Sequence, residues 1–507
     1  MRRLLLVICT LLPFVSAAQV INPRDTIKPK TKVDTTEFWN DSLFNLPRQK
    51  ALRDGAVFKG PKAKKKVRKF RVQYSDRIQY SVLFDIPMTA NAGVPTTLAL
   101  QKKLVDWEDA LLPSKINGDT TLKERTVSSL YRFAKIWLVD APIESILLAA
   151  EQDFFGSMAR TREFGLNGTS YAFRAPYPLP FWKPLGTMTF DRPLVESAAS
   201  RQELSQINGS ALDAGALATE QLSLRWMQRK SLTYREALHS LRAQMAGIAS
   251  VYSASSTSEP GTTAAEDWLY YTNRQFGHIS EFGYTAKNLR KDYALAAFTN
   301  PNLYTSLYSV FYKYMIEGQD SMATPAIRFG YGKYVLPWVR FSFSPFGPEW
   351  IPSVTVTHHR QMIQLYGRIG NSVFSESYGG GIKLFNIKRN QKVNINAHVS
   401  IWKQRYFFRN WIAQETEPIG WGGAAVVSGN LLLTKSWKHP MSLAFQAGYK
   451  TRGFMEAEVW DAGPIAKIGL SFALDRDYTE DDTVPEYIFP ESRKKAKSNT
   501  SSKRRRK

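Results

Sequence analysis

A histidine and a serine two residues apart are the pair whose types and spacing best suit nucleophilic chemistry. His398 and Ser400 fall in a run, residues 393–402, in which apolar and polar side chains alternate. A period of two predicts a β-strand, so both side chains point to the same face. A histidine beside a serine hydroxyl can activate that hydroxyl as a nucleophile. Asn394 and Asn396 share the face and offer an amide that would orient the imidazole.

The pair resembles the His and Ser of outer-membrane phospholipases, which also stand two apart on a barrel strand. The resemblance implies a lipid or envelope hydrolase with His398 and Ser400 as its catalytic pair. One conflict opposes this hypothesis. Polar positions of a membrane-barrel strand face the lumen, whereas a lipase needs its pair on the lipid side. We therefore assign no catalytic residue and keep the hydrolase as the alternative to an ordinary polar strand face.

A second segment, residues 148–157, resembles a zinc-peptidase helix that lacks its ligands. Glu151 stands where the general base would be, but Ala150 and Phe154 occupy the two positions that need histidine. The resemblance implies at most a degenerate, non-catalytic relative of a metallopeptidase. The competing interpretation, which we favour, is an amphipathic helix that buries Ile146, Leu147, Ala150 and Phe154.

No other pattern in the chain predicts a metal or cofactor site. The histidines have no ligand spacing, and the single cysteine, Cys9, lies close to the N-terminus. A phosphate-binding glycine loop is also lacking at the strand-to-helix junctions. We therefore expect neither a metal nor a cofactor.

The strand pattern around His398 recurs over residues 326–475. Eight to nine strands are expected there, and an isolated early strand is expected at residues 77–85 as an edge or closing strand. We predict an antiparallel β-barrel of roughly 8–10 strands. Gly379-Gly380-Gly381 is interpreted as a bulge or bend within it.

Helical periodicity precedes the barrel, so the predicted fold class is α+β. Residues 76–325 form the predicted mainly helical domain, with the early strand included. Thr233 followed by Glu236 fits a capping box at a helix start. Residues 165–210, rich in Pro, Gly and aromatic residues, are predicted to be an extended loop. Helices are expected at residues 127–139, 143–162, 217–229, 234–252, 264–273, 288–298 and 303–316.

The N-terminus predicts export. Arg2 and Arg3 precede an apolar stretch, residues 4–15, and small residues follow at 16–18, so residues 1–18 are a predicted signal peptide. No later apolar run is long enough for a transmembrane helix. A membrane location would therefore have to come from strands. Outer membrane and periplasm both remain open.

Positive charge is concentrated in two segments. Residues 59–71 and 493–507 carry much of the formal net charge of +24. In an exported protein we expect them to meet anionic lipid phosphates or envelope polymers, and not nucleic acid. Solvated, disordered tails explain them equally well. They belong to a flexible basic leader, residues 19–75, and to a tail, residues 476–507, that is first acidic and then basic.

Aromatic placement favours a membrane barrel over a soluble one. Seven of the thirteen tryptophans fall in the strand region, where most lie near predicted strand ends: Trp338, Trp350, Trp402, Trp411, Trp421, Trp437 and Trp460. In this the chain resembles bacterial outer-membrane β-barrel proteins with a helical periplasmic portion. The resemblance implies a Gram-negative outer-membrane protein that contacts lipid and serves envelope structure, transport or assembly. We predict that it is non-enzymatic and that its helical region lies in the periplasm or plugs the barrel. A soluble exported β domain would instead turn residues such as Val399 and Ile401 inward.

Overall fold

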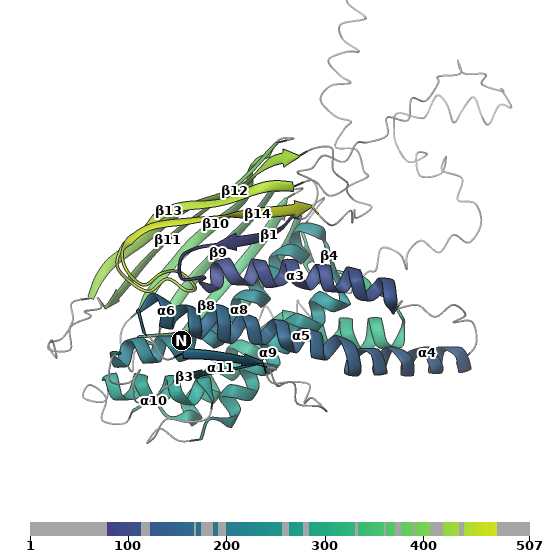
Figure 1. Ribbon diagram of the computed structural model, residues 1–507, viewed down its shortest axis with the longest axis horizontal. Coiled ribbons are helices and arrows are strands. Elements are labelled where there is room, and N and C mark those ends of the chain that lie inside the picture. The colour runs from purple at the N-terminus through teal and green to yellow at the C-terminus, as the bar shows by residue number, and fades with distance from the viewer. Residues whose placement is uncertain are drawn as a thin grey trace, which may run out of the picture.

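The computed structural model describes residues 79–112, 122–166, 169–173, 186–190, 199–255, 263–276, 283–329, 333–358, 361–370, 377–389, 392–405, 419–434 and 441–473. The predicted signal peptide, the basic leader, both basic segments and the C-terminal tail lie outside the described residues. The fold is mixed helix and sheet, and most helices precede the sheet in the chain (Figure 1).

One antiparallel sheet of ten strands dominates the second half of the described chain. Its order is β1-β14-β13-β12-β11-β10-β9-β8-β7-β6. From β6 to β14, strands that are adjacent in the sheet are also adjacent in sequence, and β1 alone pairs with a distant strand. The predicted early strand is confirmed as an edge strand, because β1 (Gln79–Phe84) pairs with β14 (Gly463–Ala473). The other strands are β6 (Ile327–Arg328), β7 (Lys333–Ser344), β8 (Gly347–His358), β9 (Gln361–Gly370), β10 (Tyr378–Arg389), β11 (Val393–Arg405), β12 (Ile419–Thr434) and β13 (Met441–Lys450).

The predicted closure into a barrel is wrong. In the part of the chain that is described, β1 and β6 end the sheet and do not pair with each other. Strand β6 covers only the start of β7, because its pairs are Ile327 with Val335 and Arg328 with Tyr334. The remainder of β7 is therefore a backbone edge that needs other hydrogen-bond partners.

Helix α8 (Arg201–Arg229) and helix α10 (Ala264–Phe276) supply those partners. Asp213 Oδ1 accepts from the Phe343 N–H at 2.9 Å, Gln206 Nε2 donates to the Phe343 carbonyl at 3.2 Å, and Trp268 Nε1 donates to the Ser344 carbonyl at 3.2 Å. Gly209 permits this approach, since a Cβ there would lie 2.6 Å from the Phe343 oxygen. Helix side chains thus replace the strand that would close a barrel.

The opposite edge is sealed in the same manner by helix α3 (Ala90–Leu111). Thr96 Oγ1 accepts from the Leu83 N–H at 3.2 Å and donates to the Ala92 carbonyl within its own helix. Both edges of the open sheet are therefore tied to the helical layer.

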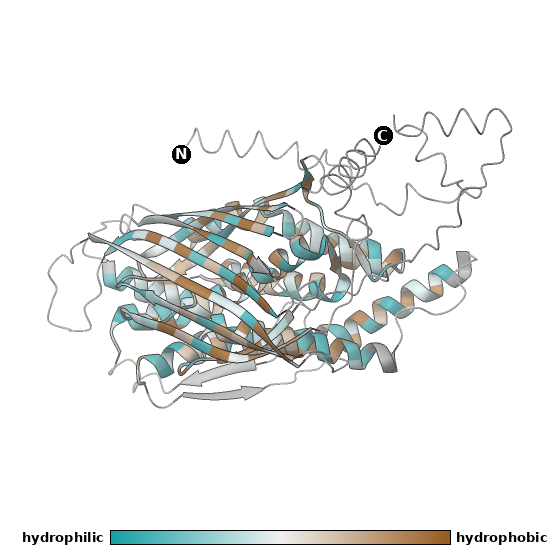
Figure 2. Cartoon of the chain, turned by 90° about the horizontal axis from the view of Figure 1, so that it is seen from above, coloured by the Kyte–Doolittle hydropathy of each residue, from teal (hydrophilic) through white to brown (hydrophobic). Residues whose placement is uncertain are grey.

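The two faces of the sheet have opposite character. The face turned away from the helices carries the apolar members of the alternating pattern. Figure 2 shows brown, apolar positions interspersed with teal, hydrophilic ones along the strands. Val399 is 48 % exposed and Ile401 is 57 % exposed. Other exposed large side chains of this face are Val354, Ile363, Leu365, Ile369, Tyr378, Trp421, Val427, Leu431, Leu433, Tyr449, Ile468 and Leu470.

The helices pack against the other, polar face. Besides α3, α8 and α10, they are α4 (Leu122–Lys135), η3 (Ile136–Asp140), α5 (Ala141–Ala149), η4 (Ala150–Ser157), α6 (Met158–Glu163), α9 (Tyr234–Ser253), α11 (Ala286–Thr299), α12 (Pro301–Leu307) and η5 (Tyr308–Ile316), where η marks π-helical turns. Two short hairpins complete the described elements: β2 (Thr169–Phe173) with β3 (Gly186–Phe190), and β4 (Ser231–Thr233) with β5 (Ser321–Ala323). None of the described helices is both long and apolar enough to cross a bilayer.

Helix positions agree with expectation except at two places. The capping box at Thr233 and Glu236 is present. Residues 201–210, predicted as loop, form the first turns of α8, which begins at a second capping box made by Ser200 and Glu203. Helix α3 was not predicted. Both segments lack a simple apolar stripe because they pack on several sides at once.

Several tryptophans differ from the expected interfacial placement. Trp338, Trp402 and Trp460 are buried, whereas Trp421 is 61 % exposed on the apolar face. Trp411 and Trp437 lie outside the described residues. Three of the described tryptophans of the strand region are therefore core residues.

Candidate functional site

His398 and Ser400 both lie on the polar face of β11, turned toward the helices. The Tyr366 hydroxyl, from β9, is 2.7 Å from His398 Nε2 and also lies beside the Ser400 hydroxyl. Gly381 leaves room for this tyrosine, because a Cβ there would lie 2.5 Å from the Tyr366 oxygen. The glycines at 379–381 continue strand β10, and the bulge lies farther on, between Leu384 and Lys388.

The surroundings of His398 make it a weak base. Burial, and then the nearby Lys383 ammonium, lower the pKa of His398 to about 3. Its Nε2 atom is engaged with Tyr366, and no hydrogen bond within the described residues joins His398 to Ser400. Asn396 does not orient the ring either, because its Oδ1 accepts from the Asn386 N–H at 2.9 Å. The pair is close in space but is not arranged as a nucleophile and its base.

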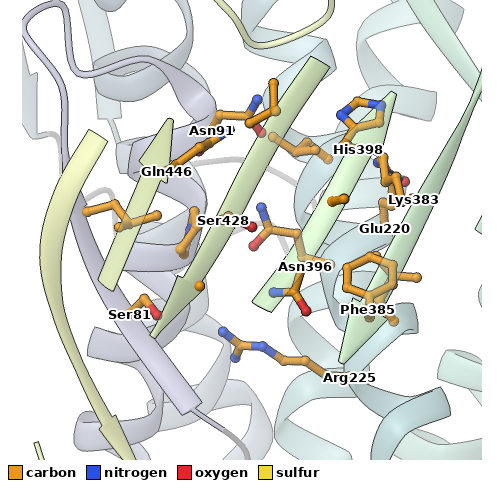
Figure 3. Close-up of a pocket in the computed structure, with 18 of the residues that line it drawn as sticks. Ser81, Asn91, Glu220, Arg225, Lys383, Phe385, Asn396, His398, Ser428 and Gln446 are labelled. Atoms are coloured by element: carbon orange, nitrogen blue, oxygen red, sulfur yellow. Dashed lines mark hydrogen bonds and ion pairs between the residues drawn. The ribbon is translucent and has the colours of Figure 1, made fainter. Parts of the chain in front are cut away.

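His398 is instead part of the wall of a cavity of about 410 Å³ between α8 and strands β9–β13. Figure 3 shows side chains from both layers around it, with Glu220 and Arg225 from α8 opposite Lys383, Asn396 and His398 from the sheet. Its volume falls within the range of small-molecule sites, about 300–1,000 Å³. Along α8 the cavity runs inward from the exposed Gln228, past the half-buried Arg225, to the buried Glu220.

Ion pairs join the helix to the sheet at the inner end of this cavity. Glu220 lies 2.6 Å from Lys383 Nζ on β10 and 3.3 Å from Arg340 Nη2 on β7. Burial alone would raise the pKa of Glu220, but Arg340 and Lys383 outweigh it and lower the pKa to about 2. Glu220 is therefore ionised and ties α8 to two strands.

Uncharged polar side chains form the sheet wall of the cavity. Asn394 and Asn430 face each other across β11 and β12, and Asn396, Ser428 and Gln446 form the next cross-strand row. The Oδ1 atoms of Asn394 and Asn430 are buried, and no group in the described part of the chain donates a hydrogen bond to either. This wall offers hydrogen bonds that the protein does not use.

A second cluster of charged groups lies inside the helical layer. His239 on α9 stands between two carboxylates, with Nδ1 at 2.7 Å from Glu144 and Nε2 at 3.0 Å from Glu151. Arg235, one turn earlier, lies 2.8 Å from Asp140 and 2.9 Å from Glu108. All six side chains are buried.

The electrostatics of this second cluster fit a structural network. Burial would lower the pKa of His239, but Glu151 and Glu144 outweigh it and raise the pKa to about 10. A protonated imidazole cannot bind a metal, since coordination needs the neutral ring. Separately, the described residues contain no group of three or more His, Cys, Asp or Glu side chains placed to hold a metal ion. Glu151, whose sequence context resembles a zinc-peptidase helix without its ligands, is here the counter-ion of His239.

The predicted buried face of the helix that carries Glu151 was only partly right. Leu147 is buried as expected, but Ile146 is exposed, while Glu144 and Glu151 point inward. The π-helical turns of η4 begin at Ala150, so they shift the angular positions of Glu151 and Phe154 but do not account for the exposure of Ile146.

Sequence reasoning missed most of the helix side of the cavity and all of the His239 cluster. On α8, Gln221, Arg225 and Gln228 recur at i+4 and i+3 spacing beside Glu220 and form a polar stripe in a mostly buried helix, which indicates a solvated face. The partners of His239 lie about 90 residues earlier in the chain, so no local pattern connects them. Comparisons of the chain with protein-family models, with curated proteins and with solved structures found no match.

Proposed function

We propose that this protein is a non-enzymatic outer-membrane protein, in which the apolar face of the sheet contacts lipid and the helical layer fills the polar side. The observation that carries the proposal is the direction of the alternating pattern. Exposed apolar side chains cover the face away from the helices, while ion pairs and amides occupy the face against them. A water-soluble sheet packed on helices would have the opposite arrangement.

The apolar positions follow one another in cross-strand rows. One row runs through Leu365, Ile382, Val399 and Ala425, and the next runs through Ile363, Leu384, Ala397 and Val427. The outward positions of β12 from Trp421 to Leu431 extend about 33 Å along the strand, which is roughly 25 Å across a membrane at the usual tilt of about 40°. That is the height of the apolar band of outer-membrane proteins.

An interfacial row borders this band. Tyr378, Lys403 and Trp421 are cross-strand neighbours on β10, β11 and β12. The rings of Tyr378 and Trp421 lie 5.9 Å apart, and the Lys403 ammonium lies 5.3 Å from the centre of the Tyr378 ring. Aromatic and basic side chains are favoured at the depth of the lipid headgroups.

We do not extend the proposal to catalysis. The hydrolase hypothesis needs a base that activates Ser400 on the lipid side of the sheet. His398 instead faces the helices, has a strongly lowered pKa and is hydrogen-bonded to Tyr366.

A matched pair of arginine substitutions tests the proposed location. Val427→Arg places a charge at the middle of the band, and Leu295→Arg places the same charge at a similarly exposed apolar site on α11. We expect the wild type to remain with membranes through a carbonate wash and to fold from urea into phospholipid vesicles. Val427→Arg should weaken insertion by about 2–4 kcal/mol, the cost of a basic residue at the midplane. Leu295→Arg should insert like the wild type.

Two results would contradict the proposal. One is recovery of the wild-type protein in the soluble fraction after the carbonate wash. The other is equal insertion of the two variants, because a sheet face in water would tolerate arginine at Val427 as well as α11 does at Leu295.

A further inference from the structure

The cavity between α8 and the sheet has features that go beyond a lipid-embedded scaffold, and they do not depend on the membrane location. It is about 410 Å³ in volume, and it opens beside the exposed Gln228. Each part of its lining places a separate requirement on an occupant. Together these requirements define a chemical class of ligand.

The first requirement comes from charge. Lys383 and Arg340 are paired with Glu220, and Arg368 is paired with Glu349 at 2.6 Å. Arg225 remains, and no carboxylate of the described residues pairs with it. Its guanidinium carbon lies 4.4 Å from the centre of the Tyr80 ring, which leaves its N–H groups free for another acceptor. A guanidinium held in this way at a cavity entrance selects an anionic group such as phosphate or carboxylate.

The second requirement comes from the sheet wall. The Oδ1 atoms of Asn394 and Asn430 are buried without a donor from the described residues, so an occupant must donate to them. The same two side chains also carry Nδ2 N–H groups, which are hydrogen-bond donors. A hydroxyl group both donates and accepts, so it satisfies a carboxamide in either orientation of the amide. An apolar occupant would leave these atoms unpaired at a cost.

The geometry adds a third requirement, because both features border one space. Arg225 projects from α8 toward the sheet strand that carries Asn396, with Ser428 on the neighbouring strand (Figure 3). An occupant must therefore combine an anionic end at Arg225 with several hydroxyls along the amide wall. We propose that this cavity binds a polyhydroxylated anion, of the sugar-phosphate or sugar-acid class.

Isothermal titration of the full chain in detergent tests the proposal with four probes: glucose 6-phosphate, glucuronate, glucose and inorganic phosphate. We expect at least one of the two sugar anions to bind at least tenfold more tightly than either glucose or phosphate alone. The comparison of glucose 6-phosphate with glucuronate then tells which anionic group the site prefers. Because the titration is done in detergent, its result is independent of whether the protein inserts into membranes.

Variants separate specific recognition from general attraction to a basic protein. Arg225→Gln should reduce binding of the preferred sugar anion at least tenfold, to the level of glucose. Arg274→Gln is the matched control, because Arg274 also lies over a tyrosine ring, Tyr270, outside the cavity lining. Asn430→Ala should weaken the sugar anion about fivefold and leave phosphate unaffected.

Three results would overturn the proposal: no saturable binding of either sugar anion, equal binding of all four probes, or equal losses in Arg225→Gln and Arg274→Gln. The first would mean that water alone fills the cavity. The second would mean that the cavity does not distinguish a sugar anion from its separate parts. The third would mean that Arg225 makes no specific contact with the ligand.

Discussion

At the scale of single residues, buried ionisable side chains take their roles from their charged neighbours and not from their type. His398 and His239 are both histidines, but their protonation states at neutral pH are opposite. Burial and Lys383 lower the pKa of His398 to about 3, whereas two carboxylates raise the pKa of His239 to about 10. The first is neutral and the second is charged at neutral pH, so only His239 acts as a counter-ion.

Replacing His239 should therefore be costly. His239→Gln leaves Glu144 and Glu151 buried without their shared cation, and we expect a loss of about 3–5 kcal/mol in the free energy of unfolding. Because the folded-state pKa is raised above the ordinary value of about 6.5, the stabilisation is complete below pH 6.5 and declines as the pH rises toward 10. Denaturant unfolding at pH 6 and pH 9 measures both effects.

The control is His358→Gln, at an exposed histidine of β8. It should change the stability by much less than His239→Gln at either pH. A difference between wild type and His239→Gln that grows from pH 6 to pH 9 would show that the imidazole is not the charged partner of the two carboxylates.

Residue types alone could identify part of the candidate site. The alternation around His398 correctly placed Asn394, Asn396 and His398 on one polar face, because strand geometry fixes the direction of every second side chain. It could not show that Tyr366 approaches His398, since that contact depends on strand register and on the missing side chain of Gly381.

At the scale of elements, the sheet ends at an edge where helix side chains, and not a further strand, hydrogen-bond to the backbone of β7. Strand β7 has a neighbour on only one side over most of its length, and α8 and α10 occupy the other side. The number of strands in the main sheet and most of the helices were predictable from periodicity, but helix α3 and the open edge of the sheet were not. Closure depends on which groups hydrogen-bond to the backbone N–H and C=O groups of the edge strands. A helix side chain such as Asp213 can accept from these N–H groups in place of a strand.

Asp213 gives a test of this edge. Burial raises the pKa of Asp213, so its neutral form is favoured and Asn is a close substitute. Asp213→Asn keeps an acceptor for the Phe343 N–H, whereas Asp213→Leu leaves that buried group unpaired. We expect Asp213→Leu to cost about 1–3 kcal/mol more than Asp213→Asn in urea unfolding.

Amide hydrogen exchange at Phe343 supplies a local measurement for the same pair of variants. Exchange should be faster in Asp213→Leu than in Asp213→Asn. If the two variants unfold and exchange alike, the helix does not stabilise the β7 edge through this carboxyl group.

At the scale of the whole molecule, the sheet is completed by a strand from the other end of the chain. Phe84 on β1 pairs with Ile468 on β14, and α3 covers the outer side of β1. Without β1, the backbone of β14 would be an open edge that can pair with a second copy of the chain.

Proline substitutions in β1 test this role. The Leu83 N–H points toward α3, so by alternation the Val82 N–H points toward β14 and the Ser81 N–H points away from it. Val82→Pro should therefore disrupt the pairing with β14 and increase the dimeric fraction seen by light scattering in detergent. Ser81→Pro, the matched control, should remain as the wild type. Equal dimer fractions would contradict the assignment of β1 as the protective edge.

The pairing of β1 with β14 also determines the order in which the protein can assemble. Synthesis makes β1 before any other described element, yet its neighbour is the last strand to be made. Every other strand of the sheet has a neighbour that is adjacent in sequence and can pair with it at once. Contacts between segments so far apart in sequence form slowly, and a strand that is not yet paired is prone to aggregate. The chain must therefore keep β1 from pairing with other strands until β14 has been made, and α3, which follows β1 directly, is the adjacent segment that can cover it.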